Sequence, residues 1–128
     1  MKKLLTESKN YKVIGEYETV YLIDKMTGKE TIIGDFYGDP VGGIIDTNER
    51  FAIMYGCGII VYSLREPFEQ YSYHTESAQW SDIGRDKPEM WIENVRQLDN
   101  CKFEIELEDG SKKLLCVEDN NCFVCDKE

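Results

Sequence analysis

The feature that most limits the fold of this chain is a series of short apolar runs separated by turn residues. Residues 18–24 and 31–36 are two such runs, rich in β-branched and aromatic side chains, and "KMTGKE" lies between them. This arrangement is typical of a β-hairpin. Three more runs follow, separated by Asx or Gly residues, and they predict a three-stranded meander: "GGIID", "FAIMYG" and "IIVYSL". We therefore expect a first β meander over about residues 11–64.

The chain from Met90 onward repeats this organisation. Three apolar residues alternate with three glutamates over residues 103–108, which is the period of a strand with one solvated face. Asp109 and Gly110 then form the strongest two-residue hairpin signal in the chain. These patterns predict a second β meander over residues 90–126.

Residues 91–98 allow two interpretations. Trp91, Val95 and Leu98 have the spacing of one stripe of a short helix. The β-branched Ile92 and Val95 favour a strand instead, and a turn followed by a clear strand comes next. We predict a strand here.

The connection between the two meanders, residues 65–89, lacks a steady period and contains two prolines and one glycine. We expect one helical turn in it, near Pro67 to Tyr71. Connections of this length inside a compact domain are usually functional or disordered, and the aromatic content here argues against disorder. The sequence thus predicts a single all-β domain over residues 1–128: two antiparallel meanders forming a sandwich or an open barrel, with at most one short helix.

The charge of the chain narrows the range of partners. Twenty-five acidic and 15 basic side chains give a net charge of −10. Nucleic acid and anionic membrane surfaces are repelled by such a field, whereas a basic protein is attracted. Solubility alone explains an acidic surface equally well.

The N-terminal stretch "MKKLLTESKNYKVIGEY" has the lysines of a signal peptide but only two leucines where an apolar run of about 7–15 residues is needed. No stretch approaches the roughly 18 apolar residues of a membrane span. We expect a cytoplasmic protein of bacterial type. Its five cysteines, an odd number, should then remain reduced.

The glycine-rich stretch "IIGDFYGDPVGGIID", residues 32–46, raises the question of a ligand loop. Phosphate and dinucleotide loops open a helix, whereas this stretch runs into a predicted strand and has no adjacent lysine. Its acidic residues do not have the spacing of a calcium loop. Turn geometry at strand ends explains most of it.

A small enzyme is the main rival interpretation. It would use the acidic loop around Asp35 and Asp39 together with His74, the single histidine of the chain. No nucleophile motif accompanies this histidine, so we favour a solvated loop residue. An adaptor subunit of a larger assembly is a third possibility.

The cysteines leave a zinc site open, since four of them lie in the last 28 residues: Cys101, Cys116, Cys122 and Cys125. A zinc knuckle needs a tight turn between its two ligands. Phe123 and Val124 instead form a strand pair that sends Cys122 and Cys125 to opposite faces. We favour small buried hydrophobic cysteines, with no metal and no cofactor.

The long connection supplies the best candidate surface, because it interleaves aromatic rings with carboxylates. Tyr and Trp are enriched among the residues that dominate protein–protein binding energy. Acidic side chains around them complement a basic partner. Phe68 and Trp80 could equally close one end of the barrel or sandwich, while Tyr71 and Tyr73 are favoured as contacts. The predicted partner-binding residues are Glu66, Glu69, Tyr71, Tyr73, Glu76, Trp80 and Asp82.

Two segments, residues 33–64 and residues 91–117, resemble in their general pattern the small acidic β-rich immunity proteins of bacterial polymorphic toxin systems. The resemblance implies a cytoplasmic protein that binds one cognate toxin domain tightly and blocks its active site. Such toxins are often nucleases, whose surface is basic. Immunity proteins vary at their contact residues, so the resemblance assigns no role to any position.

Overall fold

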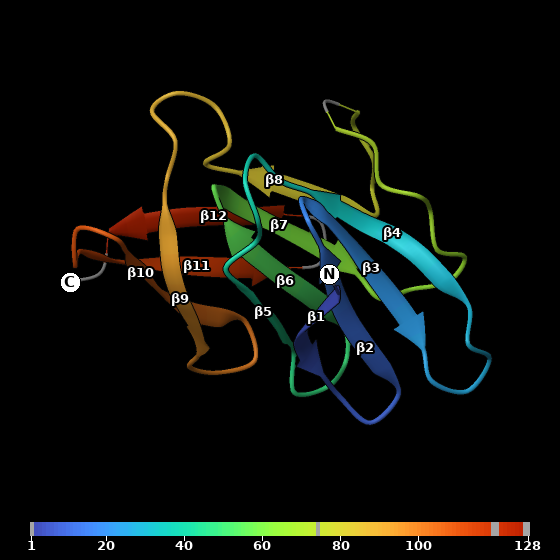
Figure 1. Ribbon diagram of the computed structural model, residues 1–128. Helices are drawn as coiled ribbons and strands as arrows, with labels where there is room; N and C mark the ends of the chain where they lie inside the picture. Colours follow the sequence, from blue (N-terminus) through green and yellow to red (C-terminus); the bar gives the residue numbers. More distant parts are fainter. Residues whose placement is uncertain (1, 74, 119–120, 127–128) are drawn as a thin grey trace.

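The computed structural model describes residues 2–73, 75–118 and 121–126. Within them the protein is all-β, with twelve strands in three antiparallel four-stranded sheets and no helix (Figure 1). The predicted all-β class is confirmed. The sheets form open layers of a sandwich.

Each sheet is a meander, so that strands adjacent in sequence are paired. The first sheet contains β1 (Lys2–Glu7), β2 (Tyr11–Glu16), β3 (Thr19–Asp24) and β4 (Glu30–Asp35). The second contains β5 (Gly42–Ile45), β6 (Phe51–Gly56), β7 (Gly58–Ser63) and β8 (Trp80–Ile83). The third contains β9 (Ile92–Gln97), β10 (Lys102–Leu107), β11 (Lys112–Glu118) and β12 (Asn121–Asp126).

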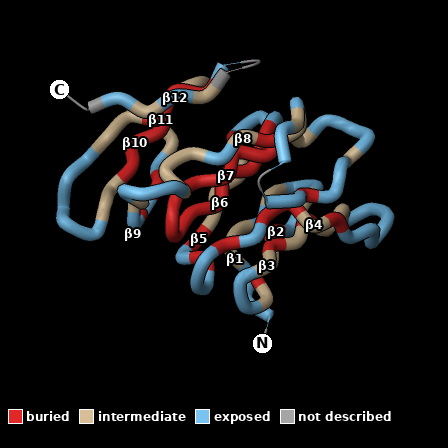
Figure 2. The backbone as a smooth tube through the Cα atoms, turned by 90° about the horizontal axis from the view of Figure 1, so that it is seen from above, coloured by how far each residue is buried: buried red, intermediate tan, exposed pale blue. Residues whose placement is uncertain are grey.

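The second sheet lies between the other two and is buried on both faces. Every residue of β6 is buried, and so is every residue of β7 except Ser63 (Figure 2). One face of β6 and β7 packs on the first sheet through Ala52, Met54, Ile60 and Tyr62. The other face packs on the third sheet through Phe51, Ile53, Tyr55, Ile59 and Val61. The apolar runs that predicted this meander are continuous because neither face meets water.

The division of the chain differs from the two predicted meanders. The segment 11–64 belongs to two sheets, separated by the loop over residues 36–41. Phe36 and Pro40 of this loop are buried, which fixes the crossing from the first sheet to the second. The sequence analysis also missed β1, whose lysines and threonine give it a weak strand pattern.

The connection 65–89 is more ordered than predicted. It contains β8, and the helical turn expected near Pro67 to Tyr71 is absent, so that prediction was wrong. The chain runs along the edge of β4 instead. The backbone N–H of Tyr71 donates to the carbonyl of Ile32 at 2.8 Å, and the N–H of Ile32 donates to the Gln70 side chain at 2.7 Å. These bonds cover an edge that would otherwise be open to pairing.

The predicted strand over residues 91–98 is confirmed as β9. An isolated bridge between Cys57 and Trp91 joins the turn after β6 to the start of this strand. The alternating residues 103–107 lie in β10, in which Phe103 and Ile105 face the core between the second and third sheets.

The double burial of β6 can be tested at two neighbouring positions. We expect Ile53→Ala and Met54→Ala each to lower the free energy of unfolding by about 2–5 kcal/mol, since both side chains are fully buried, on opposite faces. The exposed Lys12→Ala variant should stay within about 0.5 kcal/mol of the parent protein. Urea unfolding followed by circular dichroism measures all three. A near-neutral effect of either β6 variant would mean that only one face of the sheet is covered.

Candidate partner-binding surface

The structure separates the seven predicted contact residues into buried and exposed ones. Tyr71 and Trp80 are buried, with their ring centroids 5.0 Å apart, and Trp80 stacks on Tyr62 at 6.2 Å. Their prediction as surface contacts was wrong, because Trp80 opens β8 on its core face and Tyr71 inserts where the chain covers β4. For Trp80 the alternative interpretation, a ring that closes the sandwich, describes what is found.

Three predicted glutamates, Glu66, Glu69 and Glu76, are exposed along the connection. The Glu69 carboxylate accepts a hydrogen bond from the Ser77 hydroxyl at 3.0 Å. Glu66 borders a cavity of about 310 Å³ beside the β3–β4 hairpin. The other two predicted residues, Tyr73 and Asp82, are joined through Arg85.

Arg85 binds three separate segments together. Its Nη1 lies 3.0 Å from the Asp82 carboxylate, and its Nη2 donates to the carbonyl of Asp35 at 2.6 Å. The guanidinium also lies over two rings, 4.8 Å from the centroid of Phe36 and 5.1 Å from that of Tyr73. An almost fully buried arginine with an ion pair and two ring contacts is a rigid junction.

Tyr71 and Gly58 also help to form this junction. The Tyr71 hydroxyl donates to Asp82 at 2.8 Å, and burial followed by this contact raises the pKa of Tyr71 well above its ordinary value. Tyr71 therefore remains a hydrogen-bond donor at any physiological pH. Gly58, at φ 85°, leaves room for the arginine, because a Cβ there would lie 2.4 Å from Cδ of Arg85.

The β2–β3 turn lies against the same region. The N–H of Phe36 donates to the carbonyl of Glu18 at 2.8 Å, and the N–H of Gly38 donates to its carboxylate at 2.6 Å. These bonds hold the turn that contains Tyr17 against the loop that contains Tyr37. Arg85 contacts the rings of both Phe36 and Tyr73, so the 36–41 loop and the turn bonded to it lie near the chain at residues 72–73.

Three tyrosines at this end are exposed to solvent: Tyr17 by 72%, Tyr37 by 76% and Tyr73 by 44%. Three carboxylates accompany them, those of Glu18, Asp35 and Asp82. We call these six residues the tyrosine patch. A patch of rings with carboxylates between them offers large contact area together with negative charge.

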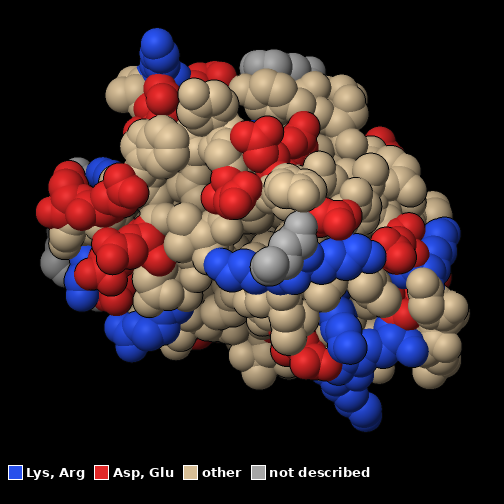
Figure 3. All heavy atoms as spheres, in the orientation of Figure 1, with Lys and Arg blue, Asp and Glu red and all other residues tan. Residues whose placement is uncertain are grey.

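Charge is distributed unevenly over the molecule. Residues 1–35 contain six lysines and six acidic residues, so the whole net charge of −10 is carried by residues 36–128. In Figure 3, acidic side chains gather over the upper part and the left edge of the face shown, while basic ones lie over β1 and toward the lower right. The 36–41 loop belongs to the part of the chain that carries the net negative charge.

The sequence analysis did not single out Tyr17 and Tyr37 as exposed aromatic residues, although Tyr17 carries a sequence signal. Tyr17 and Glu18 form the two-residue loop of the β2–β3 hairpin, in which Glu16 pairs with Thr19. Tyr17 has φ 55°, a left-handed conformation that hairpin turns normally assign to Gly, Asn or Asp. An aromatic residue there is strained, at a cost of about 1–2 kcal/mol, and its ring points into solvent.

One of the three residues of the rival enzyme interpretation is outside the described part of the chain, so the structure does not show whether the three lie together. Asp35 and Asp39 are exposed on the 36–41 loop or next to it, and His74 lies outside the described residues. The enzyme interpretation therefore stays untested.

A cavity of about 810 Å³ opens between the second and third sheets beside Arg65. Two of the polar side chains that line it, Ser77 and Gln79, make hydrogen bonds within the chain. The Gln79 amide donates to the carbonyls of Ser63 at 2.6 Å and Arg65 at 2.9 Å, and Ser77 donates to Glu69.

The cysteines are reduced in this structure. As predicted, Cys122 and Cys125 lie on opposite faces of β12: Cys122 packs on the core, whereas Cys125 is exposed. Burial, and then the nearby Cys125, raise the pKa of the Cys116 thiol, which disfavours the thiolate needed for metal binding. Among the described residues, no three histidine, cysteine or acidic side chains are grouped to hold a metal ion.

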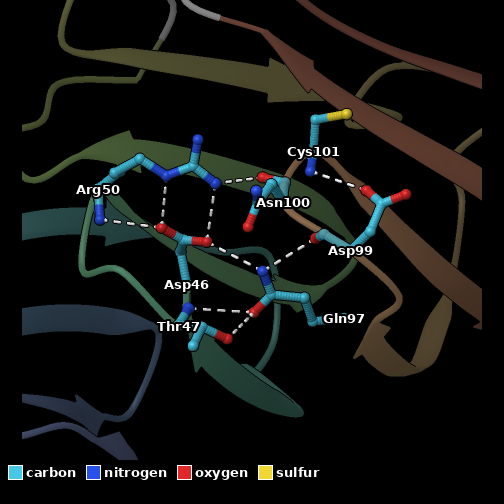
Figure 4. Close-up of polar contacts among 7 residues, drawn as sticks. All are labelled: Asp46, Thr47, Arg50, Gln97, Asp99, Asn100 and Cys101. Atoms are coloured by element: carbon cyan, nitrogen blue, oxygen red, sulfur yellow. Dashed lines mark hydrogen bonds and ion pairs between the residues drawn. The ribbon is translucent and has the colours of Figure 1, made fainter.

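Asp46, which directly follows β5, has a fully buried carboxylate (Figure 4). Arg50 donates to it from Nε at 2.8 Å, from Nη2 at 3.0 Å and from its backbone N–H at 3.1 Å. The Gln97 amide adds a bond of 2.9 Å. Burial by itself raises the pKa of Asp46, but these hydrogen bonds outweigh it and hold the pKa below the ordinary value of 3.8.

This network has a structural role. Gln97 also accepts from Thr47 and donates to the carbonyl of Asp99, while Arg50 donates to the carbonyl of Asn100. The β5–β6 turn is thereby joined to the β9–β10 turn, which locks the second sheet to the third. A carboxylate engaged by four donors has little capacity left for a ligand.

Comparison with protein-family models, with curated proteins and with solved structures found no match to this chain. Its function is therefore argued from its own residues. The described residues include no helix with the length and hydropathy needed to cross a membrane.

The structural role of Asp46 predicts a pH-dependent effect of Asp46→Asn. The pKa of the folded carboxyl is below its unfolded value, so its contribution is complete above about pH 4 and is lost as the pH falls through the folded pKa. We expect the variant to be less stable by about 1–3 kcal/mol at pH 7, and this difference to shrink at pH 3. Urea unfolding at the two pH values measures it. An unchanged difference would contradict the account.

Proposed function

We propose that this protein is an immunity protein, which binds and neutralises a cognate bacterial toxin domain. The toxin is a basic protein, with a nuclease as the expected class. The protein acts by occlusion, in the cytoplasm, and carries out no chemistry of its own.

The observation that carries this proposal is the tyrosine patch. Exposed aromatic rings held at fixed positions supply binding energy with little loss of side-chain freedom. The ring of Tyr73 is held by Arg85, and the backbone segments that carry Tyr17 and Tyr37 are held together by the bonds between Glu18 and the 36–41 loop. Carboxylates between the rings match a basic surface and speed association. The net charge of residues 36–128 adds to this attraction.

The proposal is tested by protection of growth. The protein is co-expressed with the toxin domain encoded by the neighbouring gene, and colony formation is counted. We expect the parent protein to restore growth and the triple variant Tyr17→Ser, Tyr37→Ser, Tyr73→Ser to lose this protection. Loss of two or three anchoring rings should weaken binding by about 100-fold or more.

A matched control removes exposed apolar side chains elsewhere. Met26 lies in the β3–β4 turn and Leu98 follows β9, and both are exposed. The double variant Met26→Ser, Leu98→Ser should protect as well as the parent protein. Circular dichroism establishes that both variants are folded. Full protection of growth by the folded triple variant would contradict the proposal.

A further inference from the structure

The tyrosine patch has the chemistry of a receptor for one particular side chain. Its exposed rings are flat and electron-rich, and carboxylates lie beside them. We infer that the patch docks an arginine-bearing segment of the partner, with guanidinium groups stacked on Tyr17, Tyr37 and Tyr73. Glu18 and Asp35 provide the ion-pairing oxygens.

The molecule already contains one instance of this arrangement. Arg85 lies between the rings of Phe36 and Tyr73, with Asp82 as its ion-pair partner. The buried face of Tyr73 is thus occupied by a guanidinium, while 44% of the residue remains exposed. The exposed rings of Tyr17 and Tyr37 offer the same elements, an aromatic face and a carboxylate nearby in the chain, and no arginine among the described residues lies over either ring.

The backbone at Tyr17 is an independent sign that its ring is used. Gly, Asn or Asp would fit φ 55° without strain, yet a bulky aromatic stands there and buries little of its surface. Its ring gains nothing from the core, which is formed by other residues. A strained residue with an exposed ring is explained by a contact outside the chain.

Arginine fits this surface better than lysine. A guanidinium is planar and weakly hydrated, so it stacks on a ring while its N–H groups still reach a carboxylate. An ammonium is a strongly hydrated point charge and loses more solvation on such a contact. The expected advantage is about two- to fivefold in Kd for a single exposed site.

The inference rests on the proposed function only in requiring that the patch is a contact surface. Its test uses two peptides of matched length and charge in place of the toxin, Gly-Arg-Gly-Arg-Gly amide and Gly-Lys-Gly-Lys-Gly amide. Each is titrated into the isotope-labelled full chain at 0.15 M salt, a concentration at which diffuse attraction is screened beyond roughly 8 Å. Amide chemical shifts report which residues respond.

We expect the arginine peptide to shift residues 16–19, 36–39 and 72–73, with a Kd about two- to fivefold below that of the lysine peptide. Tyr17→Gly provides the decisive variant. It should leave the midpoint of thermal unfolding unchanged or higher, because glycine relieves the turn, and it should weaken binding of the arginine peptide. The Met26→Ser variant should bind like the parent protein.

Three outcomes would overturn the inference: equal shifts with both peptides, shifts spread over the acidic turn at residues 106–109, or a lower midpoint for Tyr17→Gly with unchanged peptide binding. The two proposals can fail separately. Arginine binding without growth protection removes the immunity role alone. Growth protection without arginine preference removes this inference alone.

Discussion

Both faces of the second sheet are covered by other sheets, and this burial determines how the rest of the molecule is arranged. β6 and β7 have no solvated face, so almost every side chain they carry is buried. The first and third sheets can then alternate, with one face on this core and one in water. Because three layers pack in this way, polar variation is confined to outer faces, turns and loops, and any functional surface must lie there.

The turns at one end of the layers are held more firmly than surface loops usually are. Arg85 joins β8, the 36–41 loop and the chain around Tyr73, while Glu18 joins the β2–β3 turn to the same loop. At the other junction, Asp46 and Gln97 lock the second sheet to the third. Rings carried on such a scaffold lose little freedom when a partner covers them, which is the physical basis of the proposed binding role.

The sequence predicted strands well wherever a pattern was local, as in the alternation of residues 103–108 and the strand at 92–97. It did not predict the division into three sheets, since "FAIMYG" reads the same whether one or both faces are covered. Tyr71 and Trp80 were misplaced because an aromatic ring in a polar segment can cover a core as readily as bind a partner. Tyr73 and Asp82 lie at the surface, and their junction with Arg85 could not be predicted because it depends on contacts between distant segments. Tyr17 was detectable in principle, as a bulky residue in a two-residue hairpin turn.

Amide hydrogen exchange, compared between the free protein and its purified complex with the toxin domain of the neighbouring gene, tests the central claim most directly. The account predicts slower exchange on binding at residues 16–19, 36–39 and 72–73, with the buried strands β6 and β7 already protected in the free protein. Protection confined to the groove beside Arg65, or to the outer face of the third sheet, with the tyrosine patch unchanged, would contradict it.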